Sequence, residues 1–445
     1  MSVLVRNGAI SNLSLALHPT RDRMLPLQSP LEAYRADLSR HPNRTDFGRS
    51  DTVWLLVAHC LHRLSRAQGD ARRAIAENCA SAIGDLAATV TPDTPEEAAM
   101  LEQLARLRRG LPLVETKRTA GEVVGSARIL ADQMADAGAL WLAFSTLGHA
   151  RLAATAAPHR DLGLAMADQA WVARSLGDLD SADELYDGVA SAGESYSIPE
   201  LQARAMLGKG VTARVRGNYP KARAYLRDGL ALAEDAGLSD LAAVGHQGLL
   251  IAAGTAGDLN TALVHGWAAH ELLVSDPNRQ AEVLLNLSQA SLDAGQAQAA
   301  RSGFLASLSR SDSARFRLAC LGGVVVASAA IGDGAMLGKM ANVAEEWLAA
   351  TAFPYESAGV LKSLYHAFTI AGEAERAEGY RVRARALARK NGFFEIVLAT
   401  EPAKAPAVAV PSAAKTRLSS ESMQVIHSLE ALETEPVAEA LALTP

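Results

Sequence analysis

The feature that most constrains the fold is a glycine that recurs at intervals of 37 to 40 residues. Glycine readily adopts the left-handed conformation that ends a helix. The residue after it is often Asp or Asn, which caps the start of a following helix. The spacing therefore predicts seven antiparallel helix pairs, each turning at one glycine. These glycines are Gly138, Gly177, Gly217, Gly257, Gly295, Gly332 and Gly372, and the capping residues are Asp178, Asn218, Asp258 and Asp333.

Small residues follow each glycine at fixed positions, which indicates close packing within each pair. An alanine lies five positions after most of these glycines, and a second small residue lies twelve positions after most of them. The chain has 88 alanines, and only 5% of its residues are aromatic although 49% are hydrophobic. Alanine is the best helix former, and strand-forming residues are scarce. We therefore expect an all-α protein, with Ala222 and Ala262 buried between paired helices.

Over residues 119–391 this pattern resembles the tetratricopeptide repeat family, which builds a solenoid from antiparallel helix pairs. The units here are longer than the family's usual 34 residues. They are similar to the repeat regions of bacterial regulators of the MalT type and of peptide-sensing regulators. The resemblance implies a right-handed superhelical solenoid in which the first helix of each pair lines a concave groove.

The sequence divides into four regions. Residues 1–118 are expected to form an N-terminal helical cap with an irregular start, in which a helix pair over 51–88 turns at Gly69. Residues 119–398 are the repeat array, and 399–418 form an Ala- and Pro-rich linker. Residues 419–445 comprise a short amphipathic helix and a tail. That helix could cap the last repeat, occupy the groove or dock on a partner, and disorder is the alternative.

Charge and composition exclude several classes of function. The net charge of −6 and the absence of a basic run argue against nucleic-acid binding. No apolar stretch is long enough to span a bilayer, and the sequence Gly-x-x-x-x-Gly-Lys-Ser/Thr of nucleotide-binding loops does not occur. Three scattered cysteines favour a reducing compartment. We expect a cytoplasmic bacterial protein without a cofactor or membrane segment.

Two local clusters contain side chains that could bind a metal or another cation. His59 and His62 lie three residues apart, and Cys60 and Cys79 are nearly equidistant from the turn at Gly69. They could supply metal ligands for a metal-dependent enzyme, but the spacing matches no known zinc motif, and a buried cysteine pair beside surface histidines is favoured. The carboxylates Asp178, Asp180, Asp183 and Glu184 are explained by stabilisation of a helix N-terminus. We therefore assign no catalytic or metal-binding residue.

The first helices carry arginines although the chain is acidic. An aromatic anchor flanked by arginines is suited to an acidic protein or peptide partner, and the alternative is that these arginines pair with neighbouring Asp and Glu. We expect a protein- or peptide-binding scaffold, whose oligomeric state stays open. Another interpretation is a ligand- or peptide-sensing regulatory subunit that acts on a separate output protein. The candidate binding residues are Arg128, Trp171, Arg174, Arg204, Arg214, Gln247 and Gln289.

Overall fold

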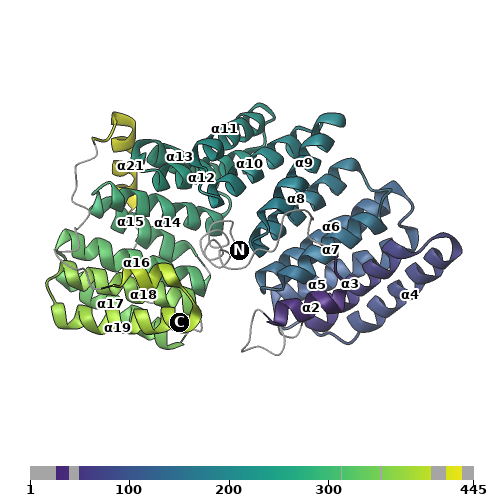
Figure 1. Cartoon of the computed structure of the whole chain (residues 1–445), viewed down its shortest axis with the longest axis horizontal. Coiled ribbons are helices and arrows are strands. Elements are labelled where there is room, and N and C mark those ends of the chain that lie inside the picture. Colours follow the sequence, from purple (N-terminus) through teal and green to yellow (C-terminus); the bar gives the residue numbers. More distant parts are fainter. Residues whose placement is uncertain (1–26, 40–49, 312, 351–352, 402–416, 433–445) are drawn as a thin grey trace. The chain divides into compact units, whose positions relative to one another are not determined.

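The computed structural model describes residues 27–39, 50–311, 313–350, 353–401 and 417–432. These residues form a helical solenoid in which neighbouring helices pack against each other, and none of them belongs to a β-strand (Figure 1). The all-α prediction is therefore confirmed. The chain divides into two compact units, which we call the N-terminal unit (residues 19–216) and the C-terminal unit (residues 217–445). The division falls within the predicted repeat array, at the turn of Gly217.

The helix pairs follow the glycine series. In chain order their helices are α6 (Lys117–Asp136) and α7 (Leu140–Ala153), α8 (His159–Leu176) and α9 (Leu179–Ser195), α10 (Pro199–Val215) and α11 (Tyr219–Asp235), α12 (Ser239–Thr255) and α13 (Leu259–Leu272), α14 (Pro277–Asp293) and α15 (Ala297–Arg310), α16 (Ala314–Ile331) and α17 (Gly334–Ala350), and α18 (Pro354–Ile370) and α19 (Ala374–Asn391). Each of the seven predicted glycines lies between two consecutive helices, with φ between 77° and 92°. Six of them join helices that pack against each other as a pair, and Gly217 lies at the boundary between the two units. An L-residue with a side chain rarely adopts this conformation.

The four predicted capping residues that follow these glycines behave as the sequence predicts. The side chains of Asp178, Asn218 and Asp258 accept hydrogen bonds from backbone amides three residues later, at 2.9, 3.2 and 3.3 Å. Asp333 accepts one from the Met336 amide at 3.0 Å. These bonds satisfy amide groups that a helix leaves free at its start. Turn and cap together explain why these four second helices begin where they do.

The small residues lie in the helix contacts. Ala222 and Ala262 are both fully buried, as predicted, and Ala262 lies in the contact between α12 and α13. A side chain added at Gly254 of α12 would lie 3.9 Å from the Ala262 Cβ, so the two helices approach closely at this level. The successive first helices α12, α14, α16 and α18 also pack directly against one another within the C-terminal unit.

Replacing Ala222 by Leu should lower the free energy of unfolding by about 1–3 kcal/mol, because a fully packed contact has no room for three more carbons. Thermal unfolding followed by circular dichroism would measure the change. Ala224 lies two residues away on the exposed face of the same helix. The Ala224→Leu variant is therefore the matched control and should unfold like the wild type. Equal stability of the two variants would show that the contact is wrongly assigned.

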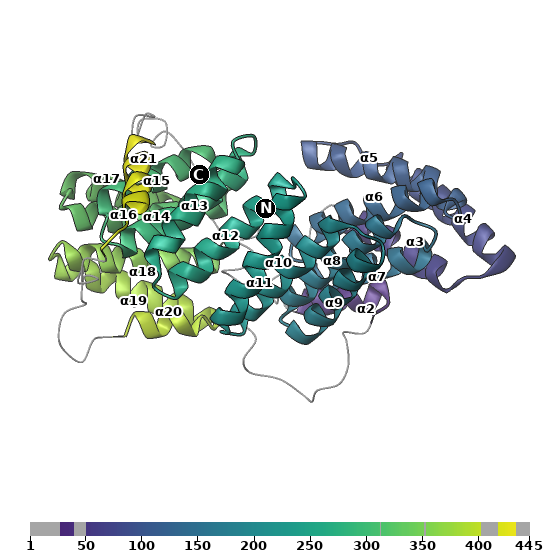
Figure 2. The ribbon, with the colours of Figure 1, turned by 90° about the horizontal axis from the view of Figure 1, so that it is seen from above.

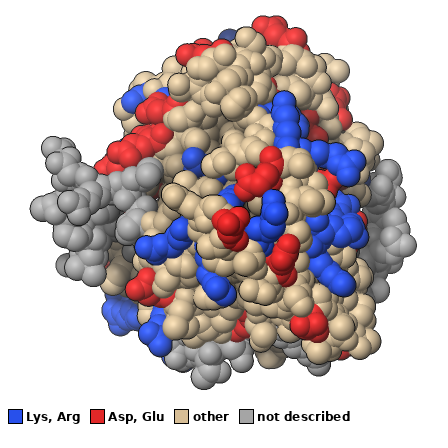
Figure 3. Space-filling view, turned by 90° about the vertical axis from the view of Figure 1, so that its right-hand side faces the viewer, with Lys and Arg blue, Asp and Glu red and all other residues tan. Residues whose placement is uncertain are grey.

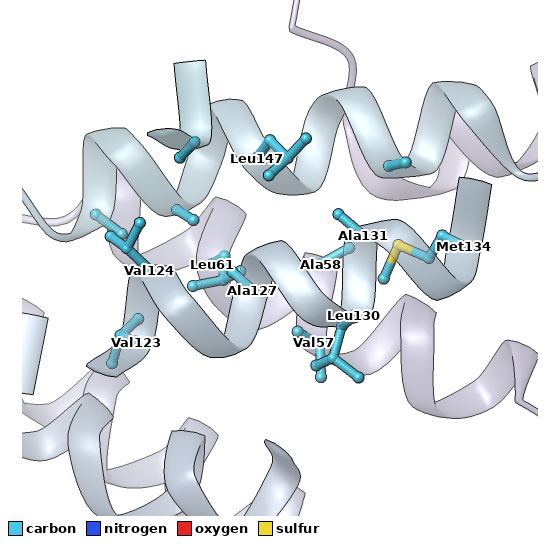
Figure 4. Packing of buried hydrophobic residues seen from close by; sticks show 14 of the residues in the cluster. Val57, Ala58, Leu61, Val123, Val124, Ala127, Leu130, Ala131, Met134 and Leu147 are labelled. Atoms are coloured by element: carbon cyan, nitrogen blue, oxygen red, sulfur yellow. The ribbon is translucent and has the colours of Figure 1, made fainter. Parts of the chain in front are cut away.

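The N-terminal unit begins with additional helices, two of which pack against α7. The additional helices are α2 (Pro30–Ser39), α3 (Asp51–Arg66), α4 (Gly69–Ala87), α5 (Pro95–Gly110) and the short 3₁₀ helix η1 (Leu111–Leu113). Helix α7 packs against α2, α3, α6 and α8, and every residue from Leu142 to Ala150 is buried. Figure 4 shows the core between α3, α6 and α7, where Leu61, Ala127 and Leu147 point toward one another. A helix that is apolar on all sides is stable only when it is surrounded.

Helix α2 also completes α7 at its N-terminus. The residue that precedes α7, Ala139, has no side chain that could cap it. Asp37 of α2 takes that role, since its two carboxylate oxygens accept hydrogen bonds from the Trp141 and Leu142 amides at 2.8 and 2.9 Å. Asp37 is completely buried. The first described helix is therefore an integral part of the N-terminal unit.

The C-terminal unit ends with two further helices. Helix α20 (Phe394–Ala399) packs against α18 and α19 and covers the end of the last pair, with Ile396 buried beside Ala358 and Ala388. Helix α21 (Ser420–Ala431) instead contacts α13 and α15 (Figure 2). Of the alternatives for the C-terminal amphipathic helix, capping of the last repeat is therefore wrong for α21. No helix in the described part of the chain is both long and apolar enough to cross a membrane.

Candidate functional site

The sequence-predicted binding residues divide between the two units. Arg128 lies on α6, Trp171 and Arg174 lie on α8, and Arg204 and Arg214 lie on α10, so these five belong to the N-terminal unit. Helix α8 packs directly against α6 on one side and α10 on the other, and we call these three helices the first-helix row. Gln247 on α12 and Gln289 on α14 belong to the C-terminal unit. Five of the seven residues therefore lie on three neighbouring helices of one unit.

Two of the arginines already have carboxylate partners. The Arg128 Nε lies 2.6 Å from Asp168 Oδ2 on the next first helix. An Arg204 nitrogen lies 3.4 Å from the Glu200 carboxylate, one helical turn earlier. Glu200 also forms an ion pair with Arg160 of α8 at 2.7 Å. Arg128 and Arg204 therefore pair with neighbouring Asp and Glu side chains, which is the alternative interpretation given by the sequence.

These ion pairs follow the repeat length. Arg128 and Asp168 are 40 residues apart, as are Arg160 and Glu200. Stacking places equivalent positions of adjacent repeats side by side, so a charge and its partner recur one repeat apart. Searching the sequence for opposite charges at this interval would have identified Asp168 and Glu200, which the sequence analysis missed.

Arg174 differs from the other arginines of this row. Its side chain is almost entirely buried, with 6% of the residue exposed. One guanidinium nitrogen donates a hydrogen bond to the Tyr186 hydroxyl at 3.2 Å. Among the described residues Arg174 makes no ion pair with a carboxylate. Burying a cation with only a neutral partner costs free energy, because burial removes the water that would otherwise stabilise the charge.

Tyr186 of α9 holds Arg174 in place and is itself tightly enclosed. The residue is 4% exposed, and its ring lies against the backbone of Gly208 on α10. A Cβ added at Gly208 would lie 2.2 Å from the ring, so only glycine fits there. Burial raises the pKa of Tyr186 and the nearby Asp168 carboxylate raises it further, whereas the Arg174 charge lowers it. The phenol therefore stays protonated and accepts the Arg174 hydrogen bond.

Trp171 and Arg214 are both half-buried. Trp171 packs partly against the core of the N-terminal unit, one helical turn before Arg174. Arg214 lies in the last turn of α10. An aromatic side chain that is half exposed beside a buried arginine offers an apolar contact next to a charge. The candidate site is therefore Trp171, Arg174, Tyr186 and Arg204, bordered by the Arg128–Asp168 pair.

The two glutamines lie in different surroundings. Gln247 is 4% exposed, and its buried Nε2 has no hydrogen-bond partner among the described residues. Gln289 is exposed and donates a hydrogen bond to Asp293 at 2.9 Å. Neither side chain takes part in the cluster around Arg174.

The histidine and cysteine cluster separates into two contacts. Cys60 and Cys79 are both buried thiols without a disulfide, and their mutual hydrogen bond together with burial raises the pKa of Cys60. His62 lies 3.1 Å from His149 of α7 instead, and His149 also contacts the Gln28 carbonyl oxygen at 3.1 Å. Burial lowers the pKa of both histidines. In the described part of the chain no three such residues are arranged to hold a metal.

The acidic cluster at the start of α9 has structural partners. Asp178 caps the helix, and Asp180 and Asp183 both pair with Arg216, with Asp180 at 2.5 Å. These bonds account for three of the four carboxylates without a bound cation.

A cleft of about 640 Å³ lies where the α3–α4 turn meets η1 and the end of α7. Arg72 lines it, but its guanidinium is bound to Glu115 at 2.5 Å and to the carbonyl oxygens of Leu64 and Ala153. Arg72 therefore ties together the C-terminal ends of α3 and α7. Figure 3 shows the side of the N-terminal unit on which α4 lies, where Lys and Arg alternate with Asp and Glu.

Comparison with protein-family models found no match for this chain, and no curated protein sequence is significantly similar to it.

Proposed function

We propose that this protein is a helical-repeat scaffold that binds a protein or peptide segment along the first-helix row of the N-terminal unit. An acidic group of that segment would pair with Arg174, and an apolar group would contact Trp171. The proposal is one of binding without catalysis. The resemblance of the 37–40-residue repeat to tetratricopeptide repeats supports it, because such repeats bind extended segments along their first helices.

The incomplete pairing of Arg174 is the observation that carries the proposal. The three helices of the row carry eight Lys and Arg side chains against six Asp and Glu. A carboxylate from a ligand would supply the charged partner that Arg174 lacks in the described chain. The surplus positive charge also favours the approach of an acidic segment at low ionic strength.

The test is to select random phage-displayed peptides on the immobilised full-length chain. We expect the selected peptides to be enriched in Asp and Glu near an apolar residue. Arg174→Met keeps the bulk of the side chain and removes its charge. It should weaken the binding of selected peptides about tenfold or more, because a hydrogen bond to a charged group contributes roughly 1.5–3 kcal/mol.

Two further variants make this result specific. Trp171→Ala should also weaken binding, whereas Arg227→Met, on the exposed surface of α11, should have no effect. Circular dichroism would verify that each variant is folded. Peptides without acidic enrichment, or full affinity in the Arg174→Met and Trp171→Ala variants, would contradict the proposed site.

A regulatory subunit acting on a separate output protein is the second candidate. Helix α21 favours it, because a segment of the chain already occupies part of the array's surface. In either case the adjacent unbridged thiols of Cys60 and Cys79 support a reducing compartment such as the bacterial cytoplasm.

A further inference from the structure

Helix α21 is bound on the side of the C-terminal unit formed by second helices. It lies across α13 and α15, although it is distant from both in the sequence (Figures 1 and 2). Val425, Ile426 and Leu429 are buried there in one apolar cluster with residues of α13, α14 and α15. The exposed side chains of Glu421, Gln424 and His427 lie on the other faces of the helix. The sequence predicts an apolar stripe of Met423, Ile426 and Leu429; Ile426 and Leu429 are buried against this chain, whereas Met423 is half-buried and Val425 is buried in addition.

Small residues on α15 make room for this helix. Ala299, Gly303 and Ala306 lie at intervals of four and three residues, so they share one face of α15. Ala299 and Ala306 are buried in the same cluster as the three apolar residues of α21. A Cβ added at Gly303 would collide with Ser288 Oγ of α14 and would lie 3.2 Å from Leu429 Cδ2, so this glycine lets α15 approach both α14 and α21. We call the surface of α13 and α15 that α21 covers the trough.

Asn260, near the start of α13, recognises the first turn of α21. Its Oδ1 accepts a hydrogen bond from the Ser419 amide at 2.8 Å, and its Nδ2 donates to the Arg417 carbonyl at 3.4 Å. The Ser422 hydroxyl donates to the Asn260 carbonyl at 3.4 Å. Ser419 also caps α21 by accepting a bond from the Ser422 amide at 3.1 Å. These polar contacts fix the register of the helix, whereas the apolar stripe holds it on the trough.

The attachment has the properties of a reversible one. Helix α21 has 12 residues, and a helix this short is marginal in water without a surface to cover. It follows residues 402–416, which lie outside the described part of the chain. A segment tethered within the same chain is held near its site at an effective concentration on the order of millimolar. A modest intrinsic affinity is then sufficient to keep the site occupied.

We propose that the trough between α13 and α15 is a binding site for an amphipathic helix of a partner protein, and that α21 is its built-in competitor. The partner helix would carry Ser or another hydroxyl residue at its N-cap, and apolar residues six, seven and ten positions later, as Ser419, Val425, Ile426 and Leu429 do. This inference concerns the second helices of the C-terminal unit. It stands or falls independently of ligand binding at Arg174.

The test uses the full-length chain and a fluorescent peptide of residues 417–432 as the probe. In the wild type, α21 competes for the trough and the peptide should bind weakly. The double variant Ile426→Asp/Leu429→Asp should release α21 and bind the peptide with an affinity at least about tenfold higher. His427→Asp changes an exposed residue of the same helix and should behave like the wild type.

Asn260→Ala, introduced into the double variant, should weaken the peptide about threefold to tenfold, because the contacts that set the register are lost. A peptide carrying the same two Asp substitutions should not bind. Failure of the double variant to bind the unmodified peptide, with α13 and α15 still protected from hydrogen exchange, would overturn the proposal.

Hydrogen exchange of the wild type gives an independent outcome. If α21 is a removable competitor, its amides should exchange at least about tenfold faster than those of α14. Equal protection would show that α21 is an integral part of the core, and would overturn the proposal even if the double variant does not fold. A concentration-dependent dimer that the double substitution abolishes would assign the trough to α21 of a second copy, and would also overturn the partner assignment.

Discussion

Replacing Asp37 by Ala should lower the free energy of unfolding of the N-terminal unit by about 2–4 kcal/mol. Loss of a helix cap costs roughly 0.5–2 kcal/mol, and each buried amide left without an acceptor costs roughly 1–3 kcal/mol. Asp37 accepts bonds from two such amides at the start of α7 and is completely buried. Water therefore cannot replace the missing carboxylate without opening the contact between α2 and α7.

Hydrogen exchange of the α7 amides is the appropriate measurement, because repeat proteins need not unfold in one step. Protection at Trp141 and Leu142 should fall first, and α2 should become sensitive to proteolysis. Arg35→Ala, on the exposed face of the same helix, is the control and should leave exchange unchanged. If Asp37→Ala also leaves it unchanged, α7 does not depend on α2 for its cap.

Replacing Gly208 by Ala should destabilise the N-terminal unit by about 1–3 kcal/mol, because the added methyl group would collide with the Tyr186 ring. The predicted separation is 2.2 Å, and the ring is too enclosed to move aside easily. Tyr186 positions Arg174, so the same substitution should also weaken any ligand that binds there. Overpacking would then be visible both in stability and in binding.

Gly125 provides a matched comparison. It lies within α6 of the same unit, and a Cβ added there meets nothing within 4 Å. Gly125→Ala should therefore be neutral or stabilise the protein by up to about 1 kcal/mol, since alanine favours the helix. Thermal unfolding of both variants would separate the collision from the general effect of adding a methyl group. Equal behaviour of the two would refute the Tyr186 contact.

The fold could be predicted from the sequence because its determinants are local and repeated. The left-handed glycines, the caps such as Asp178, and the small residues such as Ala222 act within one helix pair. Each is required by the backbone or by close packing, so each recurs at the repeat interval. Seven recurrences distinguish such a pattern from coincidence.

The candidate site was less predictable because its contacts depend on tertiary packing. The position of Arg174 in the repeat identifies its helix, but its burial against Tyr186 depends on how α8, α9 and α10 meet. The contact between Asp37 and α7 joins residues more than 100 positions apart and follows no repeat. Amphipathicity predicted the apolar stripe of α21, but not the trough on α15 that it covers.

The ion pairs spaced one repeat apart also restrict how the array can be rearranged. At equivalent positions near the start of four first helices stand Arg160, Glu200, Asp240 and Arg279, and the pairs formed are Arg160–Glu200 and Arg279–Asp240. A copy of the α8–α9 repeat inserted in place of α12–α13 would set Arg160 against Arg279. The repeats share a backbone design, but these ion pairs favour the order in which the repeats occur along the chain.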